Sequence, residues 1–509
     1  MDTFDNNVLL LLVILPLIGA GLLLPIPGGQ RSLVRWVATS FAFINMILSI
    51  YVFTYYYFSN EGGMQLTSSF SWLELPGPWP LGSQGISLAL GIDGISAPMI
   101  LLTGIVMFTG VLISWNIYDR NKDFFILYLL LLSGVFGVFV SLDLFFLFFF
   151  YELSVLPMYL LIGMWGSSSD FLTFIRTKEY SAMKLMLFLI AGSVLIWIAI
   201  LALFVEADVG SFNIMDIQGI KFSPLFQKVV FAFLAVGFGV LAGLWPFHTW
   251  SPDGHVAAPT SVSMVHAGVL MKLGAFGIIR VGMSLLPEGA DFWMPTLVIL
   301  GTINVIYGAI SALGQSDLKY VVGYSSVSHM GYVIMGIATL HPLGLSGAVL
   351  QMFSHGIMTA LFFAVVGIIY DRTHTRDISM LGGLAKQMRG TAALFTIAGL
   401  TSIGLPGLSG FVAELLVFLG LFETYVILGV LGIIGAAITA VYILRLLGKV
   451  FFGPLEERWK TQTDGSKVEM FSAAILVGFI ILVGLLPFPF MRIINLGVTD
   501  ILANFAGIG

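Results

Sequence analysis

The sequence predicts an all-α polytopic membrane protein of about fourteen transmembrane helices, and two observations lead to this fold class. Hydrophobic residues make up 58% of the 509 residues, and charged residues only 10%. An ordinary soluble domain carries about 25% charged residues, so lipid is the expected solvent for most of the chain. The apolar residues also gather in runs of about 20, the length that an α-helix needs to cross a bilayer.

The predicted helices follow these apolar runs in order. They lie at residues 8–27, 33–58, 94–117, 123–141, 143–165, 180–205, 227–247, 258–283, 293–313, 319–340, 343–370, 391–420, 424–450 and 468–490. The two helices that meet at Asp143 require a tight turn there. The stretch 59–90 is too polar and too rich in Pro and Gly to span a membrane. We therefore expect it to form an external loop with room for short strands.

Lys and Arg are distributed unequally between the two sides. With an even number of helices, both termini lie on one side. The loops on the opposite side hold Arg31, Arg35, Arg120, Lys122, Arg176, Lys178, Lys319, Arg372, Arg376, Lys386, Arg389, Arg458, Lys460 and Lys467. The loops beside the termini hold only Lys221, Lys228, Arg280 and Arg492. Because cytoplasmic loops are rich in Lys and Arg, we expect a multi-pass protein of the bacterial inner membrane with both termini outside. The acidic residues 1–5 fit this orientation and lack the basic start of a cleavable signal peptide.

Two predicted helices are interrupted in a matching way. The seventh is broken at residues 243–246 (GLWP) and the twelfth at residues 404–410 (GLPGLSG). Proline removes a backbone donor and clashes with the preceding turn, and irregular backbone at membrane depth must be buried in protein or line a watery cavity. The two breaks lie five helices apart, so helices 4–8 and 9–13 are predicted to be inverted five-helix repeats, as in many secondary transporters. Two unrelated proline kinks are the alternative.

This pattern divides the chain into four parts. Residues 1–122 hold helices 1–3 and the external loop, and residues 123–283 form the first antiporter-like repeat. Residues 293–450 form the second repeat, and residues 451–509 hold helix 14 and a tail.

Six ionisable side chains are expected at membrane depth. They are Glu152, His266, Lys272, His329, His355 and Glu414. A charged group at the bilayer centre costs about 2.5–3.5 kcal/mol on insertion scales. A lone histidine often serves packing only, and Glu152 with Lys272 could form one neutralising ion pair. The number of these groups nevertheless favours a path for protons or another cation, because burial brings the pKa values of carboxylate, lysine and imidazole groups toward neutrality.

Other classes of site are not indicated. The segment 248–255 (HTWSPDGH) contains two histidines and an aspartate, but its spacing is not helical, and a turn between two helices explains its Pro, Asp and Gly. The chain has no cysteine, which excludes disulfides and cysteine-bound zinc or iron–sulfur clusters. It also lacks a dinucleotide fingerprint, a P-loop and a nucleophile elbow. We expect no metal, no cofactor on this chain and no nucleic-acid partner.

Several segments are similar to one known family. They are residues 90–96 (LGIDGIS), 152–159 (ELSVLPMY), 248–255 with Ala258-Pro259-Thr260, 324–331 (YSSVSHMG) and 370–378 (YDRTHTRDI). They resemble the antiporter-like membrane subunits of proton-translocating NADH:quinone oxidoreductase (complex I), and the last segment resembles the subunit M (chain 4) branch. The resemblance covers about residues 85–455. It implies fourteen helices, two inverted repeats, neighbouring antiporter-like subunits as partners, and proton pumping driven by quinone reduction elsewhere in the complex.

The resemblance also implies roles for individual residues. The family's helix-five glutamate falls on Glu152, its helix-eight lysine on Lys272, its helix-ten and helix-eleven histidines on His329 and His355, and its helix-twelve acid on Glu414.

One position departs from the family pattern. The family has Lys-x-Pro in the first break, and this chain has Leu241 and Gly243 there. Glu152 therefore lacks its usual lysine partner. His266 stands where the family has an apolar residue, and it is hypothesised either to compensate for the missing lysine or to be a packing variant.

Three functions remain open at this stage. The leading one is a proton-translocating complex I subunit. A cation/proton antiporter or membrane-hydrogenase subunit shares the same features. A structural spacer that does not pump is favoured only by the missing lysine.

Overall fold

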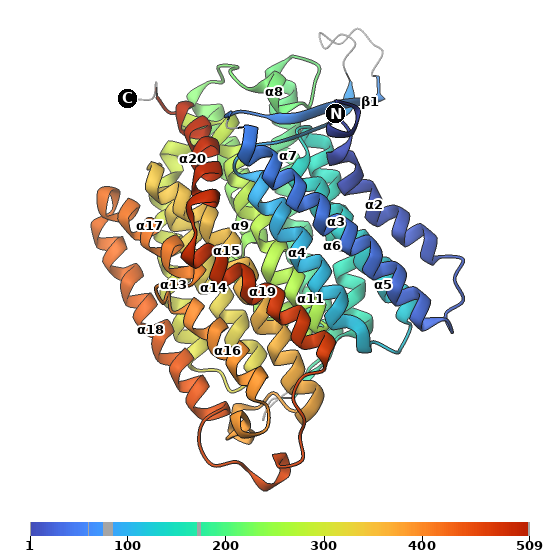
Figure 1. The fold of residues 1–509 in the computed structure, drawn as a ribbon. Helices are drawn as coiled ribbons and strands as arrows, with labels where there is room; N and C mark the ends of the chain where they lie inside the picture. Colours follow the sequence, from blue (N-terminus) through green and yellow to red (C-terminus); the bar gives the residue numbers. More distant parts are fainter. Residues whose placement is uncertain (1, 60, 75–84, 171–174, 507–509) are drawn as a thin grey trace.

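The structure is a computed structural model, and it describes residues 2–59, 61–74, 85–170 and 175–506. It is a bundle of helices that run side by side (Figure 1). Within the described residues, twelve helices are long and apolar enough to cross a membrane. The predicted class, an all-α multi-pass membrane protein, is therefore confirmed.

The elements of the first half follow the predicted order. They are α1 (Asp2–Asp5), α2 (Val8–Leu23), α3 (Arg31–Ser59), β1 (Gln65–Leu73), β2 (Ile86–Ile92), α4 (Ser96–Ile113), η1 (Ser114–Asn116), α5 (Asn121–Val140), α6 (Leu144–Trp165), β3 (Ser169–Asp170), β4 (Ile175–Arg176), α7 (Lys178–Ala207), α8 (Ile214–Ile217), α9 (Pro224–Ala242), η2 (Phe247–Thr249), α10 (Trp250–Ala257), α11 (Thr260–Val265), η3 (His266–Leu270), α12 (Met271–Gly277) and η4 (Ile278–Met283). Strands β1 and β2 pair antiparallel within the loop that was expected to hold short strands.

The second half continues in the same way. Its elements are α13 (Pro287–Leu313), α14 (Leu318–Ala338), α15 (Pro342–Thr373), η5 (Ile378–Met380), η6 (Leu384–Lys386), α16 (Arg389–Ser402), α17 (Ser409–Thr424), α18 (Val426–Val450), η7 (Glu457–Trp459), α19 (Lys467–Leu485) and α20 (Phe488–Ala503). The N-terminus and α20 lie at the same end of the bundle as β1 (Figure 1). The total of fourteen spans remains a prediction, because α2 is shorter than a typical span and α16 and α17 are separate half-length helices.

Two local predictions were wrong. The segment 248–255 is not a turn, because residues Trp250–Ala257 form the helix α10. Pro252 fits within its first turn, where backbone N–H groups have no intrahelical partner. The last predicted helix also ends at Leu485 rather than at residue 490. A further helix, α20, begins after Pro487, and it follows a turn that the apolar sequence did not reveal.

Both predicted breaks are present and have the same backbone geometry. Gly243 and Gly404 adopt positive φ angles of 73° and 76°, the left-handed conformation that glycine adopts without strain. The amide of the following Leu244 then bonds to the Gly239 carbonyl at 2.8 Å, and the amide of Leu405 bonds to the Leu400 carbonyl at 3.0 Å. This six-residue closure is the Schellman ending of a helix.

The loops before the second helix of each predicted repeat also correspond. Asp143 caps α6 and forms a bridge with Asn213, while Asp317 caps α14 and forms a bridge with Asp377. Each bridge carries two backbone hydrogen bonds, Leu144 to Phe212 and Ile214 to Leu142 in one, Leu318 to Arg376 and Ile378 to Ser316 in the other. The same local construction therefore occurs twice, 174 residues apart in sequence.

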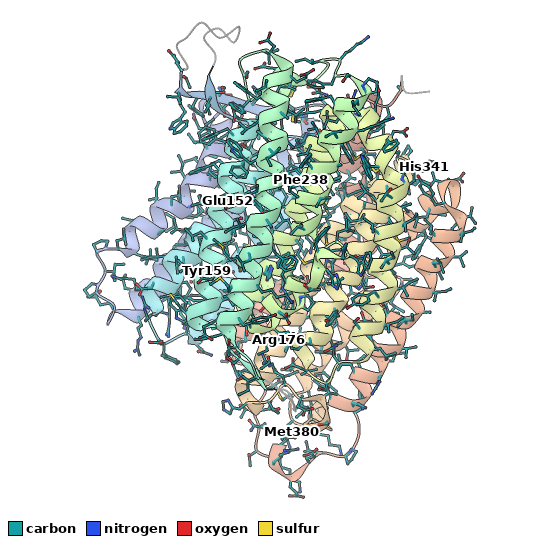
Figure 2. All side chains as sticks on the ribbon, turned by 180° about the vertical axis from the view of Figure 1, so that it is seen from behind. Glu152, Tyr159, Arg176, Phe238, His341 and Met380 are labelled. Carbon is teal, nitrogen blue, oxygen red and sulfur yellow. The ribbon has the colours of Figure 1, made fainter. Side chains whose placement is uncertain are left out.

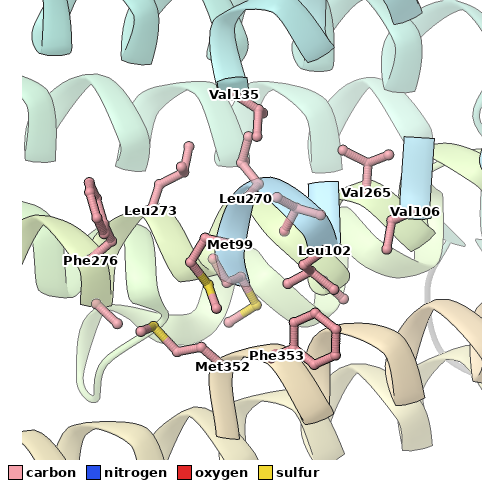
Figure 3. Close-up of a cluster of buried hydrophobic side chains, with 14 of the residues drawn as sticks. Met99, Leu102, Val106, Val135, Val265, Leu270, Leu273, Phe276, Met352 and Phe353 are labelled. Atoms are coloured by element: carbon pink, nitrogen blue, oxygen red, sulfur yellow. The ribbon is translucent and has the colours of Figure 1, made fainter. Parts of the chain in front are cut away.

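The centre of the bundle is apolar and tightly packed. Side chains from α4, the stretch α11 to η4, and α15 meet there, including Met99, Leu270, Met352 and Phe353 (Figure 3). The most apolar stretches of Thr260–Met283 and of helix α15 are entirely buried, whereas most residues in the corresponding stretches of α7 and α18 are not. Ionisable groups within the buried stretches of the first two are therefore enclosed by protein.

Candidate functional site

Lys272 lies at the centre of the enclosed helices and is completely buried. Its ammonium lies 2.8 Å from Nδ1 of His355 on α15 and also donates to the Ala267 carbonyl. Two π-helical segments, η3 and η4, flank the short helix α12 that carries it. A π-helical segment changes which carbonyls are free along a helix and is frequent at functional sites. The local backbone therefore provides the lysine with an acceptor five residues earlier.

A row of polar groups continues from His355. The ring of His355 stacks on that of His329, with centroids 5.3 Å apart. Nδ1 of His329 lies 3.4 Å from Oε1 of Glu414, and its Nε2 lies 2.8 Å from the Ser402 hydroxyl. Gln351 contacts both His329 and Glu414. The structure thus brings four predicted residues from α12, α14, α15 and α17 into one connected cluster.

The second helix break gives Glu414 its place in this cluster. A Cβ atom at Gly404 would come within 2.9 Å of Oε2 of Glu414. Ser402 is the last residue of α16, and the Ser354 hydroxyl donates to that of Ser409, the first residue of α17, at 2.7 Å. The break therefore places the Gly404 backbone against the Glu414 carboxyl group and directs the hydroxyls of Ser402 and Ser409 to groups on other helices.

The first break is closed by a residue that the sequence did not single out. Asn304 of α13 is fully buried, accepts from the Trp245 amide at 2.6 Å and donates to the Gly243 carbonyl at 2.9 Å. These are two backbone groups that the interruption leaves without helical partners. The sequence feature that could have identified Asn304 is an amide side chain in an otherwise apolar helix.

His266 lies beside the first break, in a second group of rings. It stacks on Trp250, and its ring centroid is 4.1 Å from that of His255. The Ser251 hydroxyl contacts Nε2 of His255 at 3.0 Å. Both ring nitrogens of His266 and Nδ1 of His255 are buried without a hydrogen-bond partner among the described residues. Two adjacent imidazoles thus lie near the first break, since the Trp250 ring on which His266 stacks donates to the Val240 carbonyl of α9.

Glu152 lies apart from both groups. It is half-buried on α6, between Phe149 and Leu156, which are 48% and 53% exposed. Its hydrogen-bond partner is Ser193 of α7, and no ion pair to it is recorded within the described part of the chain. Figure 2 looks onto the face of the bundle that carries it. The proposed neutralising ion pair with Lys272 is therefore absent among the described residues.

Asp253 is a buried acid that the sequence interpretation assigned to a turn. It pairs with Arg176 and with Lys184 at 2.8 Å, and it accepts from the Tyr320 hydroxyl at 3.0 Å. Asp253 follows Gly243 by ten residues, as Glu414 follows Gly404. That spacing, measured from each break, could have identified it.

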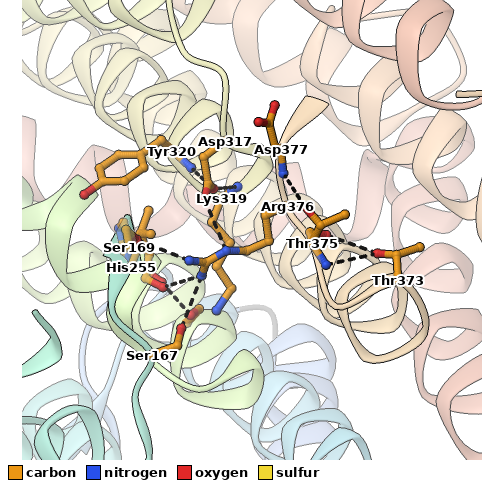
Figure 4. Close-up of polar contacts among 12 residues, drawn as sticks. Ser167, Ser169, His255, Asp317, Lys319, Tyr320, Thr373, Thr375, Arg376 and Asp377 are labelled. Carbon is orange, nitrogen blue, oxygen red and sulfur yellow. Dashed lines mark hydrogen bonds and ion pairs between the residues drawn. The ribbon is translucent and has the colours of Figure 1, made fainter. Parts of the chain in front are cut away.

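A polar group at one end of the bundle joins the two halves. Arg376 pairs with Asp317 at 3.2 Å and donates to Ser167, Ser169 and the Val256 carbonyl (Figure 4). Lys319 is buried beside it and donates to the Ala258 carbonyl at 2.8 Å. Both line a cavity of about 210 Å³, which is large enough for several water molecules.

The two capping aspartates lie outside the spanning helices and are perturbed in the same direction. Burial raises the pKa of Asp143 to about 6, although the amides of Phe146, Ser87 and Phe145 oppose this shift. Burial also raises the pKa of Asp317, and Arg376 opposes the shift there. The carboxyl without a cationic partner is thus the one that titrates near pH 6.

The chain is similar to known proteins over most of its length. Residues 141–440 match the family described as NADH:quinone oxidoreductase/Mrp antiporter, TM. NAD(P)H-quinone oxidoreductase chain 4-2 of Synechocystis sp. is 38% identical over 452 residues, covering 87% of this chain and 78% of the relative. A chain 4 protein of Thermosynechococcus vestitus is 38% identical over 489 residues, covering 94% and 89%.

Solved structures have the same fold. A chain of respiratory complex I from Thermus thermophilus matches with a TM-score of 0.87 and 26% identity, covering 98% of this chain and 100% of that one. A chain of the Mrp complex from Dietzia sp. matches with a TM-score of 0.85 and 18% identity, covering 100% of both, which shows a shared fold alone.

Proposed function

Because the chain belongs to the NADH:quinone oxidoreductase/Mrp antiporter family of transmembrane proteins, we propose that it is a proton-translocating membrane subunit of a respiratory complex I. Its relatives are described as chain 4 of NAD(P)H-quinone oxidoreductase. Electron transfer to quinone takes place on other subunits, and this chain couples to it through buried Glu, Lys and His. Its partners are neighbouring antiporter-like membrane subunits and the lipid bilayer.

One observation carries this proposal. Lys272, His355, His329 and Glu414 form a connected row at the centre of the enclosed helices. Lysine, imidazole and carboxyl groups each bind and release a proton, and burial brings their affinities closer together. A proton that moves along the row changes the electrostatic environment of the next group, which is how distant chemistry can drive transfer.

The same proposal includes the predicted arrangement in the membrane. Residues 123–283 and 293–450 act as two inverted repeats, supported by the matching breaks and the matching aspartate bridges. Both termini lie on the outer side of a bacterial inner membrane, supported by the basic residues of the loops at the other end.

His266 serves as the proton-binding group beside the first break, where Leu241 stands. Its contact with His255 and its unpartnered nitrogens support this role. Glu152 takes part in proton transfer from the periphery of the bundle, and its partner there is Ser193 rather than a lysine of this chain. A non-pumping spacer is the second candidate, and Leu241 is the observation that favours it.

The test uses the assembled complex in sealed vesicles. Lys272→Met keeps the volume of the side chain and removes its proton-binding group, and we expect proton pumping to fall at least about tenfold while uncoupled electron transfer continues. Lys221→Met, on an exposed loop residue, is the matched control. His266→Leu should lower pumping less than Lys272→Met does.

Unchanged pumping in Lys272→Met would show a spacer rather than a pump. Unchanged pumping in His266→Leu alone would leave the pump intact and show that His266 only packs.

A further inference from the structure

The row of polar groups does not end at His329. Beyond it, the Ser402 hydroxyl lies 2.8 Å from Nε2 of His329, and it also interacts with the Tyr442 phenol on α18. The phenol donates to Ser325 at 2.7 Å and also interacts with Thr439. Ser402, Tyr442 and Ser325 are all at least 97% buried. A continuous set of hydroxyl groups therefore leads away from the cluster.

Tyr442 also lines a cavity. The cavity has a volume of about 170 Å³, and its other lining residues include Gln315, Ser316, Val321, Arg445 and Lys449. A water molecule occupies about 30 Å³ of the liquid, so several fit. Ser316, Arg445 and Lys449 are exposed, so the cavity reaches the surface. It lies where α13 ends and α18 ends, at the end of the bundle far from β1 (Figure 1).

We propose that Tyr442 and Ser402 form a proton-conducting branch that connects the His329–Glu414 pair to the surface cavity beside Arg445. The proposal rests on the proposed function of the chain and assigns it a second aqueous access. This access is separate from the cavity beside Lys319, so protons reach Glu414 without passing Lys272.

The transfer balances at every atom. Water in the cavity gives a proton to the Tyr442 oxygen, while the phenol gives its own proton to the Ser402 oxygen. The Ser402 hydroxyl gives its proton to Nε2 of His329, and Nδ1 of the same ring gives a proton to the carboxylate of Glu414. Each hydroxyl then again holds one proton, and one proton has moved from water to Glu414. Ser325 accepts the phenol hydrogen bond when no transfer takes place.

A purely structural tyrosine would not need this arrangement. Tyr128 is equally buried, and its hydroxyl has no hydrogen-bond partner among the described residues. The Tyr442 hydroxyl, by contrast, interacts with three hydroxyl groups from three different helices.

The experiment compares Tyr442→Phe with the matched control Tyr128→Phe in the assembled complex. Both changes remove one buried hydroxyl and keep the ring. We expect Tyr442→Phe to lower the rate of proton pumping about tenfold, with unchanged electron transfer in uncoupled vesicles, whereas Tyr128→Phe should pump normally. Ser402→Ala, which removes the other member of the branch, should give the same result.

Lys272→Met in the same preparation separates the two levels of the proposal. If Lys272→Met stops pumping while Tyr442→Phe pumps as Tyr128→Phe does, the branch is wrong and the proposed function stands. If Lys272→Met pumps normally, the proposed function fails and the branch fails with it.

Discussion

The two helix breaks share one backbone geometry but differ in the acid that follows each of them. Ten residues after Gly404, Glu414 meets an imidazole and an amide, His329 and Gln351. Ten residues after Gly243, Asp253 meets two cations and a phenol, Arg176, Lys184 and Tyr320. Glu414 thus lies among neutral or titratable groups, whereas Asp253 is ion-paired with two cations.

The same contrast extends to the groups around the breaks. In the second half, the acid and the two histidines contact one another, and Nε2 of His355 is the one imidazole nitrogen of this cluster without a hydrogen-bond partner among the described residues. In the first half, three imidazole nitrogens of His255 and His266 have no such partner in the described part of the chain, and Glu152 lies apart on a half-buried position of α6. The same backbone geometry thus supports a connected row of titratable groups in one half and an ion-paired acid in the other.

The largest expected effect is on pumping through the second half. Glu414→Gln keeps the shape of the side chain and its contacts to His329 and Gln351, but it removes the exchangeable proton. We expect the rate of proton pumping to fall about a hundredfold, the size typical of losing a positioned acid–base group, with little loss of stability. Glu423→Gln, an exposed acid of the same helix, should pump normally. Pumping at the wild-type rate in Glu414→Gln would show that the acid after the second break does not take part in proton transfer, and would contradict the proposed difference between the two halves.

The next effect concerns stability of the first half. Asp253→Asn leaves Arg176 and Lys184 without their shared carboxylate, and these cations are 27% and 19% exposed. We expect a loss of about 3 kcal/mol, near the lower limit for breaking a buried ion pair. Thermal unfolding in detergent measures it. Asp123→Asn breaks the exposed pair with Arg120 and should cost less than about 1 kcal/mol. Equal unfolding temperatures for the two variants would contradict the structural role of Asp253.

The smallest effect compares the two capping aspartates. The pKa of Asp143 is about 6 in the folded chain, against an ordinary value of 3.8 for this carboxyl group. A raised pKa means that the folded state binds the proton more tightly, so this contribution is full below pH 4 and is lost as the pH rises through 6. We expect it to be on the order of 2 kcal/mol.

The difference in unfolding temperature between the wild type and Asp143→Asn, followed from pH 4 to pH 7, isolates this contribution. Asparagine retains the capping oxygen, and Asp216, which also acts on Asp143, is present in both chains. A difference that does not vary with pH would show that the Asp143 carboxyl is already ionised.

The sequence was informative wherever one local signal determines structure. Apolar runs placed the spanning helices, and Gly-Leu followed by proline placed both breaks, because lipid and proline impose strong constraints on backbone hydrogen bonding. The family resemblance placed Lys272, His329, His355 and Glu414, and the structure brings these four together.

What was missed depends on contacts between distant segments. Helix α10 forms although its sequence is typical of a turn, because its buried Asp253 pairs with residues of β4 and α7. Asn304 closes a break 61 residues away, which no local pattern reveals. The branch through Tyr442 requires three helices to meet, so spacing along the chain contains no trace of it.

The contact between Gly268 and Gly356 limits how this molecule can move. A Cβ atom on Gly356 would come within 2.6 Å of the Gly268 carbonyl, and one on Gly268 within 3.1 Å of the Gly356 carbonyl. The two backbones therefore touch directly beside Lys272 and His355, with no side chain between them to compress. These helices have no room to approach further, and separating them would open a void in a buried part of the bundle. We therefore expect motion at this point to be a rotamer change of the Lys272 or His355 side chain, while the two helices stay in place.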